Sequence, residues 1–101
     1  MTDPNTARMF SARVAGSVQG VGFRAWVRTA ATVLGLDGHV RNLANGSIEV
    51  VASGHQDALD KLLNQLKNAP PPEATVESVT VERSNAETTL LSNAPGFQIR
   101  F

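Results

Sequence analysis

Three glycines fall within the seven residues from Gly16 to Gly22, and Arg24 follows two positions later. The residues before this stretch alternate between apolar and polar, and those after it repeat at helical spacing, so the glycines lie in a loop that leads into a helix. Free backbone N–H groups and the helix dipole attract an anion at such a place. A cation in the first helical turn opposes the dipole by ~0.3–1 kcal/mol. Arg24 therefore favours a bound oxyanion, although a solvated arginine beside a glycine-rich turn fits the spacing about equally well.

Two known phosphate-binding patterns do not account for this loop. The Walker pattern requires four residues between its glycines and then a lysine, whereas three residues separate Gly16 from Gly20 and no lysine follows. The stretch from Gly20 to Ala25 does fit G-x-G-x-x-A, but a chain of 101 residues has no room for the two-halved sheet that binds a dinucleotide. We therefore expect neither a nucleoside triphosphatase nor a dinucleotide-binding domain.

Composition excludes several other classes of protein. The chain has 101 residues, of which 42% are hydrophobic and 18% charged, which favours one folded domain over a disordered chain. Nine basic and nine acidic side chains give a formal net charge of zero, so no general attraction to nucleic acid or to anionic membranes is expected. The chain has no cysteine and only two histidines, which argues against a metal centre. The first residues lack the features of a secretory signal, so we expect a cytoplasmic protein, and at this size a monomer.

The hydrophobic pattern predicts a two-layer α+β sandwich of the ferredoxin-like βαββαβ type, with two helices on one face of an antiparallel sheet and a short C-terminal strand. We expect residues 1–6 to form a flexible tail and residues 7–101 to form a single domain. The dipeptide Asn45-Gly46 predicts a type I′ hairpin turn. The predicted elements are strand 9–16, a helix from 23 to about 35, strands 36–43 and 47–53, helix 55–68, strand 75–83, a polar connection over 85–95 and strand 96–101.

The loop sequence Val18-Gln19-Gly20-Val21-Gly22-Phe23-Arg24 resembles the signature of acylphosphatases. The stretch from Gly35 to Asn42 is similar to the second motif of that family, Asn45 to Glu49 to its hairpin and third strand, and Pro72 to Val79 to the start of its fourth strand. The likeness covers nearly all residues from Arg8 to the end. It implies the same two-layer sandwich, hydrolysis of the carboxyl–phosphate bond of an acyl phosphate, and no metal or other cofactor.

The resemblance also implies roles for single residues. Asn42 would orient the attacking water and Arg24 would bind the phosphate, which makes these two the predicted catalytic residues. The same loop would hold inorganic phosphate or sulfate. The predicted phosphate-binding residues, which act through loop amides and the Arg24 side chain, are Ser17, Val18, Gln19, Gly20, Val21, Gly22 and Arg24.

The implied reaction does not need acid or base side chains, which the predicted site residues lack. A carboxylate leaves with a pKa of about 4, so no general acid is needed to expel it. The remaining task is to hold the phosphoryl group and to place a water in line. No side chain is an obvious base for that water, and a phosphate oxygen of the substrate is an alternative acceptor.

An asparagine near a hairpin is more often a turn residue, but Asn42 shares a strand face with Val40 while Asn45-Gly46 serves the turn.

Two positions depart from the family pattern. Ser17 stands where the family often has a basic residue, and His39 where an aromatic is usual. On an alternating strand, His39 faces away from Asn42, so we expect it to be a packing or surface residue and not a proton carrier. We also expect Glu49 to be an exposed strand residue and His55 a solvated one, with Trp26 in the core.

Two other functions are alternatives to acyl phosphate hydrolysis. RNA-recognition domains share the βαββαβ order, but they need aromatic side chains on the third strand, and residues 47–53 contain none. The second alternative is a non-catalytic module that recognises phosphate or carbamoyl phosphate. The presence of both Arg24 and Asn42 favours a free-standing hydrolase with a small-molecule substrate and no nucleic-acid or membrane partner.

Overall fold

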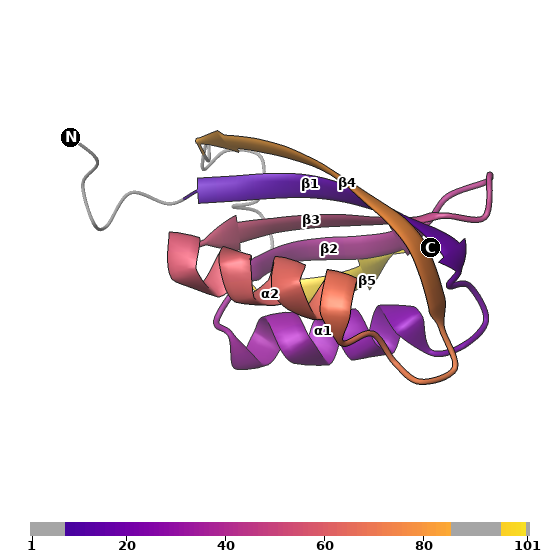
Figure 1. Cartoon of the computed structure of the whole chain (residues 1–101). Coiled ribbons are helices and arrows are strands. Elements are labelled where there is room, and N and C mark those ends of the chain that lie inside the picture. Colours follow the sequence, from indigo (N-terminus) through magenta and orange to yellow (C-terminus); the bar gives the residue numbers. More distant parts are fainter. Residues whose placement is uncertain (1–7, 86–95, 101) are drawn as a thin grey trace.

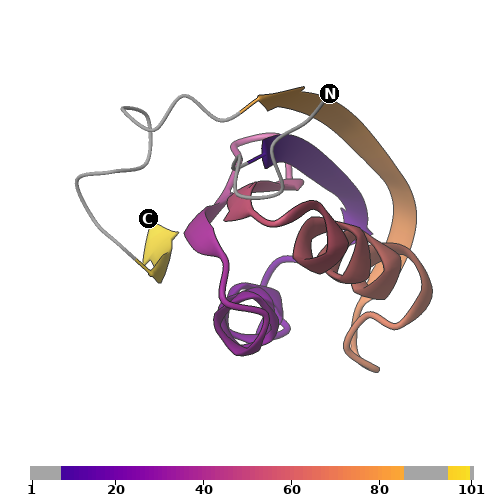
Figure 2. The same ribbon diagram turned by 90° about the vertical axis from the view of Figure 1, so that its left-hand side faces the viewer.

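The computed structural model describes residues 8–85 and 96–100. Two helices pack on one face of a five-stranded sheet, as Figures 1 and 2 show from two directions. The observed order confirms the predicted βαββαβ arrangement with a terminal strand. The elements are β1 (Arg8–Ser17), α1 (Phe23–Val33), β2 (Asp37–Asn42), β3 (Ile48–Gly54), α2 (Gln56–Asn68), β4 (Thr75–Asn85) and β5 (Phe97–Arg100).

The strands lie in the order β4-β1-β3-β2-β5. Strand β1 pairs antiparallel with β3 and β4, and β2 pairs antiparallel with β3, in agreement with the predicted antiparallel sheet. The fifth strand, whose direction the sequence pattern left undecided, runs parallel to β2. Strand β4 finishes at the end of the sheet where β2 begins. A strand that starts from that end must therefore run in the same direction as β2 (Figure 1).

The core lies between the helices and the sheet and follows the predicted pattern. In β1 the alternate residues Phe10, Ala12 and Val14 are buried, and each is at most 1% exposed. Trp26 lies at the edge of this core, half-buried, with its ring centroid 5.5 Å from that of Phe23. The four leucines of α2 are all buried and face the sheet: Leu59, Leu62, Leu63 and Leu66.

The hairpin between β2 and β3 has a different turn from the predicted one. A type I′ turn needs positive φ at both central residues, but only Gly46 has it, with φ of 92°. The N–H of Gly46 donates to the carbonyl of Leu43 at 3.2 Å, and the N–H of Leu43 donates to the carbonyl of Ser47 at 2.8 Å. This is the pattern of a three-residue loop that ends in a left-handed glycine. The side-chain oxygen of Asn45 accepts the Ser47 N–H at 3.0 Å, and this local bond favours the observed turn.

Two predictions fall outside the described residues: the flexible tail at 1–6, and the polar connection over 85–95 apart from its first residue. Neither α1 nor α2, the helices of the described ranges, is long and apolar enough to cross a membrane.

Candidate active site

The loop that joins β1 to α1 presents backbone N–H groups at the start of the helix. Gly20 and Gly22 both have left-handed φ, at 79° and 76°, on either side of Val21, whose φ is negative. Backbones of this alternating kind direct successive N–H groups to one side and form anion sites. Gly22 is the N-cap of α1, no side chain caps this end, and the first turn contains no acid. The first amides of α1 therefore lack intrahelical acceptors and give this end a positive potential.

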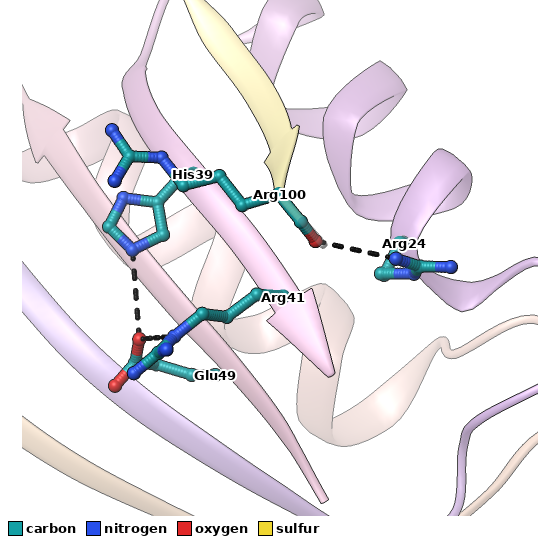
Figure 3. Close-up of polar contacts among 5 residues, drawn as sticks. All are labelled: Arg24, His39, Arg41, Glu49 and Arg100. Atoms are coloured by element: carbon teal, nitrogen blue, oxygen red, sulfur yellow. Dashed lines mark hydrogen bonds and ion pairs between the residues drawn. The ribbon is translucent and has the colours of Figure 1, made fainter. Parts of the chain in front are cut away.

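Arg24 is the second residue of α1 and is held by the last described strand. Its Nη1 atom donates to the carbonyl oxygen of Arg100 in β5 at 3.3 Å (Figure 3). The two residues are 76 positions apart in the chain. A backbone carbonyl has no sequence signature, so this contact could not be found from the pattern of residues. Strand β5 thus helps to orient the predicted phosphate-binding arginine.

Asn42 is the last residue of β2 and is exposed, while Val40 on the same side of the strand is fully buried. Asn42 therefore extends the core-facing side of the sheet beyond the core and toward the loop. A pocket of about 180 Å³ opens there. Its lining residues are Val18, Gly20, Gly22, Phe23, Arg24, Ala25, Asn42 and Ile99.

The pocket brings together Arg24, Asn42 and three of the predicted loop residues. Ser17, Gln19 and Val21 do not line it. Ser17 is exposed at the end of β1, opposite Thr75 of β4. Sequence reasoning missed Ile99, which lies beside Val40 in the parallel pairing of β5 with β2. The only signal for it was the short final strand, in which apolar and polar residues alternate.

The side chain of Gln19 points to the hairpin between β2 and β3. Its Nε2 atom donates to the carbonyl oxygens of Leu43 at 2.8 Å and Ser47 at 2.9 Å. The side-chain amide nitrogen is thereby occupied by protein acceptors. The role predicted for Gln19 in phosphate binding therefore concerns its backbone N–H, and that role stays a prediction.

His39, Arg41 and Glu49 lie on the face of the sheet that has no helices (Figure 3). Arg41 Nε donates to Glu49 Oε1 at 2.8 Å, and this bond is the main cause that lowers the pKa of Glu49. His39 Nε2 lies 3.6 Å from the same oxygen. Burial, followed by the charge of Arg100, lowers the pKa of His39, so its ring is neutral at pH 7 and this contact is not an ion pair.

These contacts decide three expectations about single residues. His39 faces away from the pocket, as predicted, and its Nδ1 atom is the one buried side-chain nitrogen or oxygen within the described ranges that has no partner. The expectation that Glu49 is simply exposed was wrong, because it lies between Arg41 and His39 and is 22% exposed. Its cross-strand neighbours are basic, which the alternation of the strand alone did not indicate. His55 is exposed at the start of α2, as expected.

No three His, Asp or Glu side chains of residues 8–85 and 96–100 gather in a group that could hold a metal ion.

Comparison with known proteins agrees with this arrangement. The family model described as acylphosphatase matches residues 10–99. An acylphosphatase of Caldivirga maquilingensis is 45% identical over 89 residues, which cover 87% of this chain and 88% of that protein. The crystal structure of acylphosphatase from Bacillus subtilis superimposes with a TM-score of 0.83 at 32% identity, over 93% of this chain and 99% of that one.

A more distant likeness concerns the fold alone. The whole chain superimposes on 13% of full-length HypF, in a phosphate- and nucleotide-bound crystal structure, with a TM-score of 0.81 and 19% identity. In contrast, the family model spans most of the chain, and the two acylphosphatases named above, both more than 30% identical, are matched over 88% and 99% of their own length. The chain therefore belongs to the acylphosphatase family of enzymes.

Proposed function

We propose that this protein hydrolyses the carboxyl–phosphate bond of small acyl phosphates to a carboxylate and inorganic phosphate, with Arg24 and Asn42 as its catalytic residues. Membership of the acylphosphatase family supports this reaction. The observation that carries the proposal is that Arg24, Asn42 and the glycine loop line one pocket. A predicted anion-binding loop with its arginine and a neutral side-chain amide thus line the same small cavity.

The loop amides and Arg24 would bind the three phosphoryl oxygens, because an array of N–H donors with one cation suits a dianion. The predicted donors are the amides of Ser17 to Gly22. Those of Val18, Gly20 and Gly22 belong to residues that line the pocket. The others belong to residues that do not line the pocket, so their contribution would come only from the backbone.

The side-chain amide of Asn42 would hold the attacking water. The oxygen of that water forms a bond to phosphorus while the bond from phosphorus to the acyl oxygen breaks, and the carboxylate leaves with the electron pair. A leaving group with a pKa of about 4 needs no proton. The described lining of the pocket contains neither a carboxylate nor a histidine. We therefore assign one proton of the water to a phosphoryl oxygen of the substrate. The other proton stays on the attacking oxygen, and the phosphoryl group leaves as dihydrogen phosphate.

We also propose that the reaction needs no metal, because positioning and the charge of Arg24 supply the stabilisation that a cation supplies in other phosphoryl transfers. We expect a monomer that acts in the cytoplasm on a small molecule, as a single domain over residues 7–101.

The test measures hydrolysis of acetyl phosphate by the purified protein in excess chelator, beside an Asn42→Ala variant and a phosphate monoester as control substrate. We expect turnover of the acyl phosphate only, and a kcat lower by on the order of 10² in the variant, the usual scale for loss of one positioned polar group. The inhibition constant of inorganic phosphate should change little, because Asn42 contacts the water. Equal kcat in both proteins would refute the role of Asn42.

A second result would favour a different function. If the protein does not hydrolyse the acyl phosphate but is stabilised by inorganic phosphate or sulfate, the chain is a phosphate- or carbamoyl-phosphate-recognising module.

A further inference from the structure

We propose that the side chain of Gln19 is a positioning residue, which sets the place of Asn42 relative to the phosphate loop. This inference rests on the proposed function. Its basis is the pair of hydrogen bonds from one nitrogen, Gln19 Nε2, to the carbonyl oxygens of Leu43 and Ser47 at 2.8 and 2.9 Å. Both bonds are partly buried and span 24 and 28 positions of the chain.

The sheet itself does not join the two halves of the site. The loop follows β1 and Asn42 ends β2, and β3 lies between these strands. No backbone ladder therefore runs from the loop to the end of β2. Among the described residues, Gln19 provides the only side-chain hydrogen bonds between loop residues 18–22 and hairpin residues 43–47.

The bonds of Gln19 attach at positions next to the predicted catalytic groups. Gln19 lies between Val18 and Gly20, both of which line the pocket. Leu43 directly follows Asn42 in the chain. A shift of the carbonyl of Leu43 relative to the loop therefore moves Asn42 relative to the bound phosphate.

The acceptors of these bonds belong to a turn with its own internal bonds. The carbonyl of Leu43 also accepts the Gly46 N–H, and that of Ser47 also accepts the Leu43 N–H. The side chain of Asn45 accepts both the backbone N–H and the hydroxyl of Ser47, whose side chain is buried. Gln19 thus holds a preformed turn, so its two bonds fix the position of the hairpin as a unit.

Hydrolysis by an in-line water is sensitive to this kind of displacement, since a misplacement of about 1 Å can lower a rate by on the order of 10². Binding of the phosphoryl group depends on the loop and Arg24, which the loss of the Gln19 bonds leaves in place. The expected effect is therefore on kcat and not on affinity for phosphate.

A Gln19→Met variant tests this role, because methionine keeps the length of the side chain and removes the donor. We expect kcat for acetyl phosphate to fall about 10-fold or more, while the inhibition constant of inorganic phosphate changes less than about threefold. Gln56→Met is the matched control, since it removes the side-chain bond from Gln56 to Asp60 on the exposed face of α2, away from the pocket. We expect this control to keep the wild-type kcat.

A double-mutant cycle with Asn42→Ala separates positioning from a general loss of structure. If Gln19 acts through Asn42, Gln19→Met lowers kcat in the wild type but has little further effect once Asn42 is alanine. If the kcat of the double variant is reduced by the product of the two single reductions, Gln19 does not act through Asn42 and the proposal is wrong. Where Gln19→Met does not fold, Gln19→Asn serves in its place, because a side chain shorter by one methylene keeps its polarity but withdraws the donor.

The wild-type protein in the same assay distinguishes the two proposals. Absence of wild-type turnover refutes the proposed function, and with it this role of Gln19. Wild-type turnover together with an unchanged kcat in Gln19→Met refutes the role of Gln19 alone.

Discussion

Replacement of Arg24 by alanine tests anion binding without any measurement of turnover. In the free protein two effects of this side chain oppose each other. A cation in the first turn of α1 is unfavourable by ~0.3–1 kcal/mol, and the hydrogen bond to the carbonyl of Arg100 is favourable by a net ~0.5–1.5 kcal/mol. We therefore expect the free energy of unfolding of the free protein to change by less than about 1 kcal/mol.

With phosphate bound, the balance changes. A charge-assisted hydrogen bond contributes about 1.5–3 kcal/mol, which corresponds to a loss of affinity of roughly 10- to 150-fold in the variant. Phosphate at 100 times the wild-type Kd stabilises the wild type by about 2.7 kcal/mol. At the same concentration, a variant with 50-fold weaker binding gains only about 0.6 kcal/mol.

Urea unfolding of both proteins with and without phosphate measures this difference. Arg28→Ala is the control, because it removes the same charge from an exposed position one turn further along α1 and outside the pocket lining. We expect phosphate to stabilise this control as much as the wild type. If phosphate also stabilises Arg24→Ala as much as the wild type, Arg24 does not hold the anion and its place in the site has been misinterpreted.

Two further predictions concern the pH dependence of stability and the apolar side chain of Ile99 in the pocket lining. The pKa of His39 is lowered from 6.5, mainly by burial, and that of Glu49 from 4.5, mainly by the bond from Arg41. In acid the unfolded chain therefore binds more protons than the folded one, and stability falls as the pH is lowered. We expect His39→Phe to flatten the loss that begins below about pH 6.5, as measured by urea unfolding across pH; curves that stay parallel to the wild type would contradict this. Ile99→Ala should raise KM for an aromatic acyl phosphate by roughly 5- to 30-fold, the equivalent of about 1–2 kcal/mol of lost apolar contact, and leave inhibition by phosphate unchanged; an equal rise for acetyl phosphate would argue against an acyl contact.

The pattern of residues predicted the elements well because burial here is one-sided. Alternation in β1 and the leucine face of α2 each indicate one apolar side, and packing of these sides produces the two layers. The direction of β5 was not predictable in this way, since four residues with alternating burial fit a parallel and an antiparallel neighbour equally well. The turn at Asn45-Gly46 was assigned wrongly because one left-handed glycine serves both the two-residue and the three-residue loop.

The candidate site divides in the same way between what residue types reveal and what only the fold reveals. The cation and the three glycines at a helix start indicated an anion site, with a solvated arginine as an equal alternative. The roles of Arg24 and the loop in phosphate binding came from the resemblance to acylphosphatases. The carbonyl of Arg100 and the apolar side chain of Ile99 have no such signature. The two bonds of Gln19 were likewise beyond prediction, since their acceptors are backbone carbonyls of a turn.

The direction of the chain explains why these groups meet at one end of the sheet. Strand β1 runs toward this end, α1 runs back, and β2 runs in the direction of β1. The loop before α1 and Asn42 at the end of β2 therefore lie at the same end of the sheet (Figure 1). Because β5 is parallel to β2, it also ends there and brings Ile99 to the pocket and the carbonyl of Arg100 to Arg24. An antiparallel fifth strand would place its first residues, and not its last ones, at this end of the sheet. The direction of β5, which the sequence pattern left undecided, is therefore the feature of the fold that completes the surroundings of Arg24.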